Sequence, residues 1–327
     1  MPEPARVAIL VISFNTRDMT LDCLRTIAAG AERTAHEVIV VDNASGDGSA
    51  EAIASAFPQY HLIASPDNLG FAAANNLAAK HTMAERLLLL NPDTLVDAGA
   101  IDRLVAFADR HPAAGIWGGR TRFADGSPNP TSCWRKPTPW SVFCSASGLA
   151  GLFKGSRLFN PESVGILPDG AELPVDVVTG CWLLIDRALW EKLGGFDPAF
   201  FMYGEDADLC LRARALGARP MVSAAAEIVH HGGQSDRVRA DKIVRLYTAR
   251  RQLYQRHWGK AWQWWADIGP MINVQRRRLV ARLRRKLDKG KAANNPGIFD
   301  QVWSQRAVWV RPAVVDRKRA SQGESQT

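Results

Sequence analysis

Three carboxylates stand close together past the middle of the chain, in a pattern that suits proton transfer. The segment Gly194 to Arg212, GGFDPAFFMYGEDADLCLR, places Glu205, Asp206 and Asp208 at the start of an expected helix, after an aromatic turn rich in glycine. Crowded carboxylates repel one another, so at least one should have a shifted pKa and could accept a proton. Acidic residues also favour helix N-termini, because free backbone N–H groups and the helix dipole stabilise them. This segment alone leaves a catalytic and a structural interpretation open.

Other polar residues follow apolar runs that we expect to be strands. Asp42 ends VIVVD and could accept hydrogen bonds from a ribose hydroxyl or a base N–H, or simply cap its own loop. Asp93 follows LLLLNP and could bind Mg²⁺ or Mn²⁺ beside a phosphate-bearing substrate. Pro92–Asp93–Thr94 also fits a simple turn. His230 and His231 precede Gly-Gly-Gln-Ser and could add a metal ligand, or form a surface pair.

The elements that must position these residues alternate along the first third of the chain. Expected strands are 7–13, 38–42, 61–64, 86–91 and 115–118, and expected helices are 19–29, 49–56, 72–83 and 100–110. Continuous Val/Ile/Leu strands separated by helices predict an α/β fold with a mostly parallel sheet covered on both faces. Ligands of such sheets bind outside the carboxyl ends of the strands. No GxGxxG follows the first strand, which argues against a dinucleotide-binding enzyme.

The remaining segments are less regular. Residues 120–174 are rich in Pro, Gly, Ser and Trp, and we expect long loops with short strands at most. Residues 175–185 resemble another strand, and helices are expected over 188–193 and 206–216. The apolar run that ends at His230 completes this part of the chain.

Composition bounds the class of protein. The chain has 327 residues, 46% hydrophobic and 23% charged, which is ordinary for a globular protein with one or two domains. Its five cysteines are scattered, without a CxxC motif, so neither a zinc site nor a disulfide framework is expected. We expect a reducing, cytoplasmic compartment, because no signal-peptide pattern follows MPEPAR.

The net charge of +8 is unevenly distributed. From Gly232 onward there are 22 Lys and Arg against 7 Asp and Glu, a net charge of +15, which leaves −7 for the front portion. Tryptophans and a basic helix over 276–289, with Leu279, Leu283 and Leu287 in a stripe, favour peripheral contact with the inner face of the cell membrane over nucleic-acid binding. A solvated helical extension that packs on protein is the alternative.

The joint order of the motifs is more specific than any one of them. Ser-Phe-Asn, VVDNASGDGS, NLGFAAANN, LLLLNPDT, GGFDPAFFMYGEDADLCLR and HHGGQS occur in this sequence. Over residues 6–235 this series resembles the family 2 glycosyltransferases of the GT-A (nucleotide-diphospho-sugar transferase) fold, and bacterial rhamnosyltransferase-like members above all.

The resemblance implies a role for each motif residue. The donor nucleotide would contact six residues, namely Ser13, Asn15, Asp42, Asn68, Gly70 and Asn75. Asp93 and His230 would hold Mg²⁺ or Mn²⁺, and Asp206 would be the catalytic base. Glu205, Trp182 and His231 are candidate acceptor contacts or secondary site residues.

One position departs from the family pattern. Asn91 replaces the first acid of the DxD-type motif, so metal binding would rely more on the nucleotide diphosphate. Asp208 and Arg212 are expected to stabilise their helix as an i,i+4 pair instead of taking part in chemistry.

These roles imply an inverting, metal-dependent glycosyltransferase. The leading donor is dTDP-L-rhamnose, a UDP-sugar being the other class, and the acceptor would be a glycan or polyprenyl-linked hydroxyl in bacterial cell-surface polysaccharide synthesis. A non-catalytic nucleotide-sugar or carbohydrate-binding module at the membrane surface is the alternative. The expected organisation is a catalytic domain over 1–235, a basic helical extension over 236–290 and a partly disordered tail over 291–327. The sequence leaves the oligomeric state open.

Overall fold

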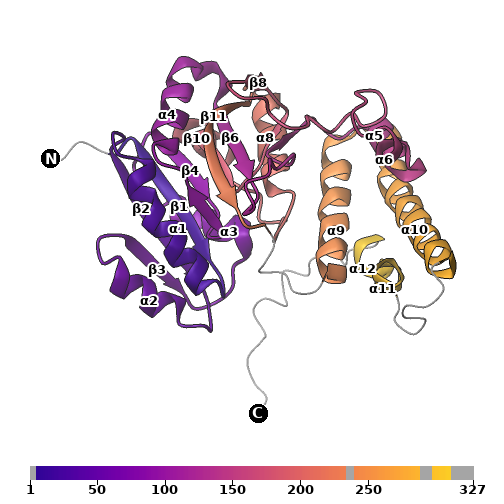
Figure 1. Ribbon diagram of the computed structural model, residues 1–327, viewed down its shortest axis with the longest axis horizontal. Coiled ribbons are helices and arrows are strands. Elements are labelled where there is room, and N and C mark those ends of the chain that lie inside the picture. Colours follow the sequence, from indigo (N-terminus) through magenta and orange to yellow (C-terminus); the bar gives the residue numbers. More distant parts are fainter. Residues whose placement is uncertain (1–4, 233–238, 288–296, 311–327) are drawn as a thin grey trace, which may run out of the picture. The chain divides into compact units, whose positions relative to one another are not determined.

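The computed structural model describes residues 5–232, 239–287 and 297–310 (Figure 1). The chain divides into two compact units. The first, here called the sheet unit, comprises Met1–Pro137 and Gly155–Arg237. The second, the helical unit, comprises Thr138–Lys154 and Val238–Thr327. Boundaries near residues 235 and 290 were expected, whereas the structure groups residues 138–154 with 238–327 in one unit.

The sheet unit is built on a sheet of nine strands within the described residues. In spatial order they are β3 (His61–Ser65), β2 (His36–Asn43), β1 (Val7–Ser13), β4 (Arg86–Leu90), β10 (Trp182–Asp186), β6 (Ile116–Arg122), β11 (Met221–His230) and β5 (Thr94–Val96), with β8 (Glu172–Pro174) also paired to β11. β1, β2, β3 and β4 pair in parallel, as do β6 and β11, and β10 runs antiparallel between β4 and β6. A short separate sheet joins β7 (Cys133–Trp134) and β9 (Val177–Val178).

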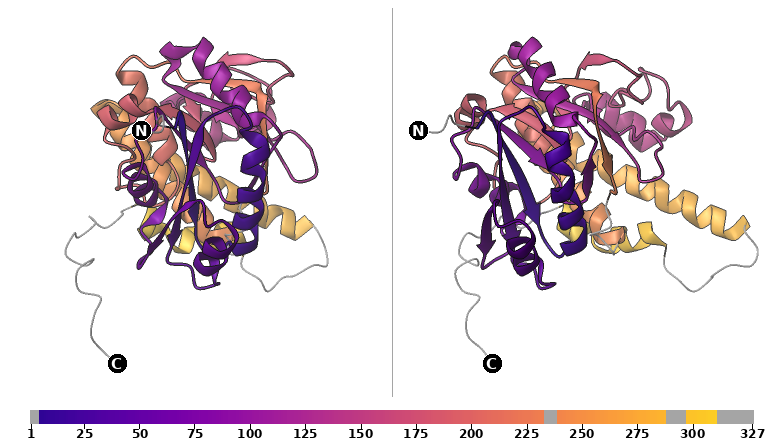
Figure 2. Two further views of the ribbon diagram at one scale, coloured as in Figure 1. Left: turned by 90° about the vertical axis from the view of Figure 1, so that its left-hand side faces the viewer. Right: turned by 60° about the vertical axis from the view of Figure 1, so that its left-hand side comes forward.

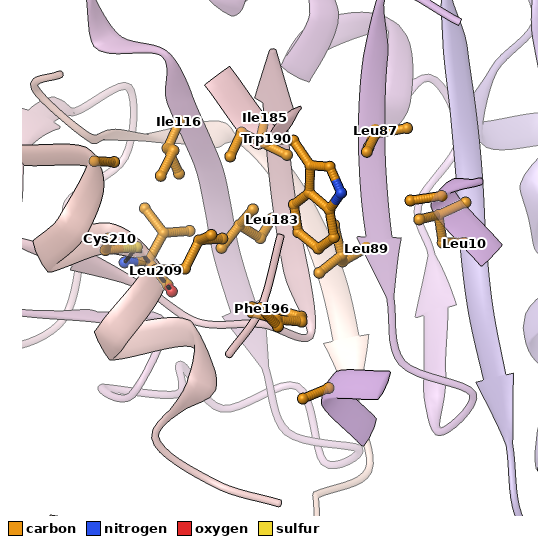
Figure 3. Close-up of a cluster of buried hydrophobic side chains, with 14 of the residues drawn as sticks. Leu10, Leu87, Leu89, Ile116, Leu183, Ile185, Trp190, Phe196, Leu209 and Cys210 are labelled. Carbon is orange, nitrogen blue, oxygen red and sulfur yellow. Dashed lines mark hydrogen bonds between the residues drawn. The ribbon is translucent and has the colours of Figure 1, made fainter. Parts of the chain in front are cut away.

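Helices cover both faces of the sheet, because residues of both parities along the strands are apolar (Figure 2). One face packs on α1 (Arg17–Gly30), α2 (Ser49–Ala56) and α4 (Ala100–Arg110). The other packs on α3 (Gly70–Ala79), α7 (Arg187–Leu193) and α8 (Glu205–Ala215). On this second face, Trp190 and Phe196 lie against Leu89 and Leu183 of the sheet, and Leu209 anchors α8 (Figure 3). The helix that carries the three carboxylates is thus fixed to the core.

The strand register brings the predicted site segments to one edge. Ser13 pairs with Asp42, and Val11 pairs with Leu90, so the carboxyl ends of β1, β2 and β4 lie side by side. A polar loop follows each of these ends. The parallel sheet and the position of these loops confirm the expected α/β architecture.

Two expectations about the irregular region differ from the structure. Residues 120–174 contain helices, α5 (Pro139–Ser147) and α6 (Leu149–Leu152), where loops and short strands were expected. Thr138 and Ser141 form a capping box that starts α5, with Pro139 at the first helical position. The expected strand over 175–185 is interrupted at residues 179–181, between β9 and β10.

The helical unit contains α5, α6, α9 (Arg239–His257), α10 (Gln263–Leu287), α11 (Ile298–Ser304) and α12 (Arg306–Val310) within the described residues. A short 3-10 turn, η2 (Lys260–Trp262), precedes α10, and another in the sheet unit, η1 (Pro112–Ala114), follows α4. Val244, Val274, Val302 and Trp309 form a core between α9, α10, α11 and α12. Part of the predicted tail over 291–327 is therefore helical, and the rest lies outside the described residues. Among the helices that the structure describes, none is both long and apolar enough to cross a membrane.

Candidate active site

The loops after β1 and β2 hold each other through the residues predicted to bind the nucleotide. Asn15 has a φ of 53°; its backbone N–H donates to Ser45 Oγ at 2.9 Å, and its Oδ1 accepts from the Gly46 N–H at 2.8 Å. Asp42 is 3% exposed, and its Oδ2 accepts from the Ser45 N–H at 3.0 Å. Its Oδ1 is buried without a hydrogen-bond partner in the structure. A donor on a bound ligand would satisfy this oxygen. Ser13 is fully buried against Thr20 and supports the strand end instead.

Asn68 and Gly70 connect the loop after β3 to the segment before α8. Asn68 Oδ1 accepts from Asn43 Nδ2 at 3.0 Å and from the Gly70 N–H at 2.9 Å. Gly70 has a φ of 77°, and a Cβ there would lie 2.6 Å from the Phe201 carbonyl oxygen. The Phe71 N–H donates to that same carbonyl at 3.0 Å. Only glycine suits this close approach of two backbone segments. The approach places the loop predicted to bind the donor against the segment predicted to carry the catalytic base.

The next turn of α3 strengthens this connection through a residue that sequence reasoning missed. Asn76 Nδ2 donates to the Phe196 carbonyl at 2.8 Å, and Asn76 Oδ1 accepts from the Phe196 N–H at 2.9 Å. Gly195 has a φ of 71°, and a Cβ there would lie 2.4 Å from Asn76 Oδ1. Asn75, the residue before Asn76, is buried. Its Nδ2 donates to the Phe71 carbonyl, and its Oδ1 has no hydrogen-bond partner in the structure. The paired asparagines of NLGFAAANN were the available signal.

Asp93 and His230 meet where β5 pairs with β11. Nε2 of His230 lies 3.3 Å from Asp93 Oδ1, and the His231 N–H donates to the Asp93 carbonyl at 2.9 Å. Burial lowers the pKa of His230, but Cys181 and Asp93 beside it outweigh that effect and raise its pKa to about 11. The two predicted metal residues are therefore adjacent, and a metal ion bound here would displace the proton that His230 holds near neutral pH. His231 contributes its backbone at this point, and the Gly-Gln-Ser residues after Gly232 lie outside the described residues.

The donor set at this point fits a magnesium- or manganese-type ion bound partly by substrate. It offers one carboxylate and one imidazole, and no cluster of three or more His, Cys, Asp or Glu side chains that could hold a metal occurs in the described residues. Asn91, which replaces the first acid of the DxD-type motif, adds a buried Oδ1 with no hydrogen-bond partner. Such ions keep several waters and are commonly bound through one or two carboxylates plus substrate phosphates.

Asp206 is oriented by two backbone N–H groups. Its Oδ2 accepts from the Gly180 N–H at 3.0 Å, and its Oδ1 accepts from the Ala207 N–H at 2.7 Å. Desolvation by the surrounding protein raises the pKa of Asp206 despite these hydrogen bonds. Gly180 belongs to the interruption between β9 and β10, beside Cys181, which neighbours His230. One short loop thus links the predicted base to the predicted metal residues.

Glu205 is a buried acid beside Asp206 at the start of α8. It is 6% exposed, and its Oε2 has no hydrogen-bond partner in the structure. Burial and the neighbouring charge of Asp206 raise the pKa of Glu205 to about 8. Glu205 therefore holds its proton near neutral pH, and the two N–H groups that donate to Asp206 favour the ionised form of that neighbour.

We expect Glu205→Gln to remove a pH dependence of stability. The unfolded carboxyl has a pKa of about 4.5 and the folded one about 8. The folded state therefore binds more protons between these values, and the free energy of unfolding should fall as pH rises from about 4.5 to 8. Urea titrations of both proteins at pH 5 and pH 8 measure this fall. It should be smaller in the variant, and equal falls would show that Glu205 ionises normally.

Asp208 has a structural role. It is fully buried, and Arg212 Nε lies 2.6 Å from its Oδ2. The Arg212 guanidinium also donates to the carbonyls of Leu193 and Gly195, at 2.8 and 2.9 Å. The expected i,i+4 pair is present, and it ties α8 to the glycine turn before it.

Trp182 is not available to an acceptor in this structure. It is fully buried in the core beneath α1 and α4, and its indole Nε1–H donates to the Ala226 carbonyl at 3.4 Å. A strand residue between β4 and β6 has no free face, which the sequence did not reveal. The five cysteines are all buried and form no disulfide, as expected.

Unsatisfied polar atoms gather at these loops. In the described residues, six buried side-chain atoms have no hydrogen-bond partner. Four of them belong to Asp42, Asn75, Asn91 and Glu205. Buried polar groups are normally paired, and each unpaired one costs free energy. All four are oxygens that can form hydrogen bonds with a ligand, so these residues have the composition of a site for a polar ligand.

Comparisons with known proteins agree with this architecture. Residues 8–164 match the model of the family described as glycosyl transferase family 2. An N-acetylglucosaminyl-diphospho-decaprenol L-rhamnosyltransferase of Mycobacterium tuberculosis is 30% identical over 223 residues, which are 65% of this chain and 71% of the relative. An O-antigen biosynthesis protein of Myxococcus xanthus is 27% identical over 72% of this chain but only 18% of its own length.

A solved structure supports the fold. The mannosyltransferase PcManGT of Pyrobaculum calidifontis, in complex with GDP-Man and Mn²⁺, is similar with a TM-score of 0.56 and 17% identity. The match covers 94% of this chain and 86% of that one. The match to the family and the similarity to the mycobacterial enzyme together establish that the chain is a glycosyltransferase of family 2, with the GT-A fold and a rhamnosyltransferase-like sequence.

Proposed function

We propose that this glycosyltransferase is inverting and metal-dependent, and that it moves L-rhamnose from dTDP-L-rhamnose to a hydroxyl of a glycan or polyprenyl-linked acceptor in bacterial cell-surface polysaccharide synthesis. The unsatisfied oxygens of Asp42, Asn75, Asn91 and Glu205 around one edge of the sheet are the main observation behind it. The choice of sugar and acceptor rests on the similarity to the mycobacterial rhamnosyltransferase. The binding-module alternative is set aside, because the family is one of enzymes and the chain has a candidate base.

Asp206 is the proposed base. It takes the proton of the acceptor hydroxyl while that oxygen attacks the anomeric carbon, and the bond from this carbon to the diphosphate breaks on the opposite face. The product has inverted configuration, and the nucleoside diphosphate leaves with the bonding electron pair. The N–H groups of Gly180 and Ala207 hold the carboxylate in place, and a protonated Glu205 keeps a second negative charge away from it.

Asp42 and the asparagines after β3 are proposed to hold the donor. The unpaired Oδ1 of Asp42 would accept a hydrogen bond from the nucleoside, at the strand end where such ligands bind. Asp93 and His230 would hold Mg²⁺ or Mn²⁺. When bound, the ion supplies positive charge that stabilises the leaving diphosphate.

A thermal-shift screen tests the choice of donor. The melting temperature should rise with dTDP-L-rhamnose in the presence of Mg²⁺ or Mn²⁺, because a ligand that binds the folded state stabilises it by mass action. UDP- and GDP-sugars are the comparison. A larger shift with another nucleotide sugar would replace the donor proposed here.

Asp93→Ala should weaken metal binding. We expect the Mn²⁺ concentration that gives half of the donor-dependent thermal shift to rise at least about tenfold, since loss of even an outer-shell partner costs roughly 10–100-fold. Asp18→Ala is the matched control, because that carboxylate is 80% exposed on α1. Unchanged metal dependence in Asp93→Ala, or an equal change in both variants, would remove Asp93 from the metal site.

A further inference from the structure

The packing of α5 on α10 fixes which sides of these two helices remain open. Val142 of α5 lies against Gly269 of α10, where a Cβ would come within 2.4 Å of Val142 Cγ1. Three or four residues further along each helix, Asn273 Nδ2 donates to Ser145 Oγ at 2.6 Å. Residue numbers increase together along the contact, so α5 and α10 run in the same direction (Figure 1). On α10, the contact line continues back to Trp265, whose Nε1–H donates to the Pro139 carbonyl.

The residues beside this contact line are apolar and exposed. Trp264, Ile268 and Ile272 each stand one position before a residue that faces α5, and they are 55%, 43% and 43% exposed. On α5, Phe143 stands one position after Val142 and is 42% exposed. One residue is a rotation of about 100° around a helix. When two right-handed helices lie parallel and in contact, the residue before a contact residue on one helix and the residue after a contact residue on the other point to the same side of the pair.

The two helices therefore present one continuous surface, here called the apolar face. Its members are Phe143, Trp264, Ile268, Ile272, Leu279 and Leu283. The α10 members follow helical spacing, and Gln275 is the only polar residue in their row. α9 and α11 occupy another side of α10, where Arg251 pairs with Asp267 and Arg278 pairs with Asp300. Among the described residues of the helical unit, the packing of the helices thus leaves the apolar face open.

The net charge of the helical unit indicates what kind of partner covers the apolar face. The helical unit contains 22 Lys and Arg against 6 Asp and Glu, a net charge of +16, while the sheet unit carries −8. A second copy docked on this face would bring two strongly positive units together, which costs free energy. An anionic bilayer attracts the same charge, and tryptophan, phenylalanine and leucine on a helix that lies in the membrane interface are stabilised there.

We propose that the apolar face of α5 and α10 docks on an anionic lipid bilayer. The helices lie in the plane of the interface with these side chains among the lipids and the surrounding arginines and lysines at the headgroups. Residues 138–153, far from α10 in sequence, supply part of this surface. The contact is independent of the sugar and the metal, so it can be tested without any transfer reaction.

Vesicle co-sedimentation of the full-length protein tests the proposal. Binding is expected with phosphatidylglycerol–phosphatidylcholine vesicles, weaker binding with phosphatidylcholine alone, and a decrease with added salt. The double variant Ile268→Ser/Ile272→Ser should bind the anionic vesicles about tenfold less tightly or worse, from the apolar area that it removes. Phe143→Ser should weaken binding as well, because it lies on the other helix of the face.

The control is Leu158→Ser/Val308→Ser, which removes two apolar side chains that are 60% and 55% exposed elsewhere. It should bind vesicles like the unaltered protein, and all variants should keep a cooperative thermal unfolding transition without any ligand, which shows that they are folded. Absent binding to anionic vesicles, or equal loss in the control, would overturn the proposal. So would sedimentation equilibrium showing a dimer that only the face variants dissociate.

Discussion

Replacing Asp206 by Asn should lower kcat by about 10²–10⁴-fold, the usual contribution of a positioned general base. The amide cannot take a proton from the acceptor hydroxyl, although it occupies the same volume. Donor binding should change little, because Asp206 is assigned to the acceptor side of the reaction. Transfer kinetics and the donor-dependent thermal shift measure the two effects separately.

Asp197→Asn is the matched control for this variant. Asp197 belongs to the same segment before α8, and its Oδ1 accepts a backbone hydrogen bond from Ala199 at 2.8 Å. Its kcat should stay within a few-fold of the unaltered enzyme. Should Asp206→Asn keep its full kcat, the base would have to be another group, and Glu205 would be examined first.

The second large effect is on stability. Asp208→Ala should lower the free energy of unfolding by about 3–5 kcal/mol, because it leaves the Arg212 guanidinium without its fully buried partner. Urea denaturation measures the loss. The loss should be smaller in Asp208→Ala/Arg212→Met than the sum of the single variants, since the double variant leaves no unpaired charge. A loss below about 1 kcal/mol in Asp208→Ala would mean that water reaches the pair.

Much of the sheet unit could be predicted from apolar patterning. The expected helices 49–56 and 100–110 match α2 and α4, and the strand 7–13 matches β1. The reason is physical: strands buried on both faces must be continuously apolar, and their ends are marked by the polar loops that carry function. The pattern also placed the loops of Asp42 and Asp93 at one edge, since parallel strands end together.

The irregular region could not be predicted in the same way. α5 is short, and its exposed Phe143 and buried Cys144 stand side by side, so the sequence there shows weak periodicity. Residues 138–154 belong to the helical unit through contacts with α10, more than a hundred residues away in sequence. The local sequence pattern does not indicate such a distant contact.

The site also has supports that local pattern could not assign. The bond between Asp206 and the Gly180 N–H joins residues 26 positions apart, and Asn76 reaches Phe196 across 120 positions. Backbone N–H groups hold Asp206, whereas Asp208 is paired with Arg212. The family resemblance had separated the roles of these two acids, but it could not supply the contacts that hold them.

The release of nucleoside diphosphate from dTDP-L-rhamnose, with a polyprenyl-diphosphate N-acetylglucosamine acceptor and Mg²⁺ or Mn²⁺, tests the central claim most directly. We predict release that requires both the acceptor and the metal, a transferred sugar of inverted anomeric configuration by NMR, and almost no release by Asp206→Asn. Release that is independent of metal, a product of retained configuration, or equal release by Asp206→Asn would contradict the account.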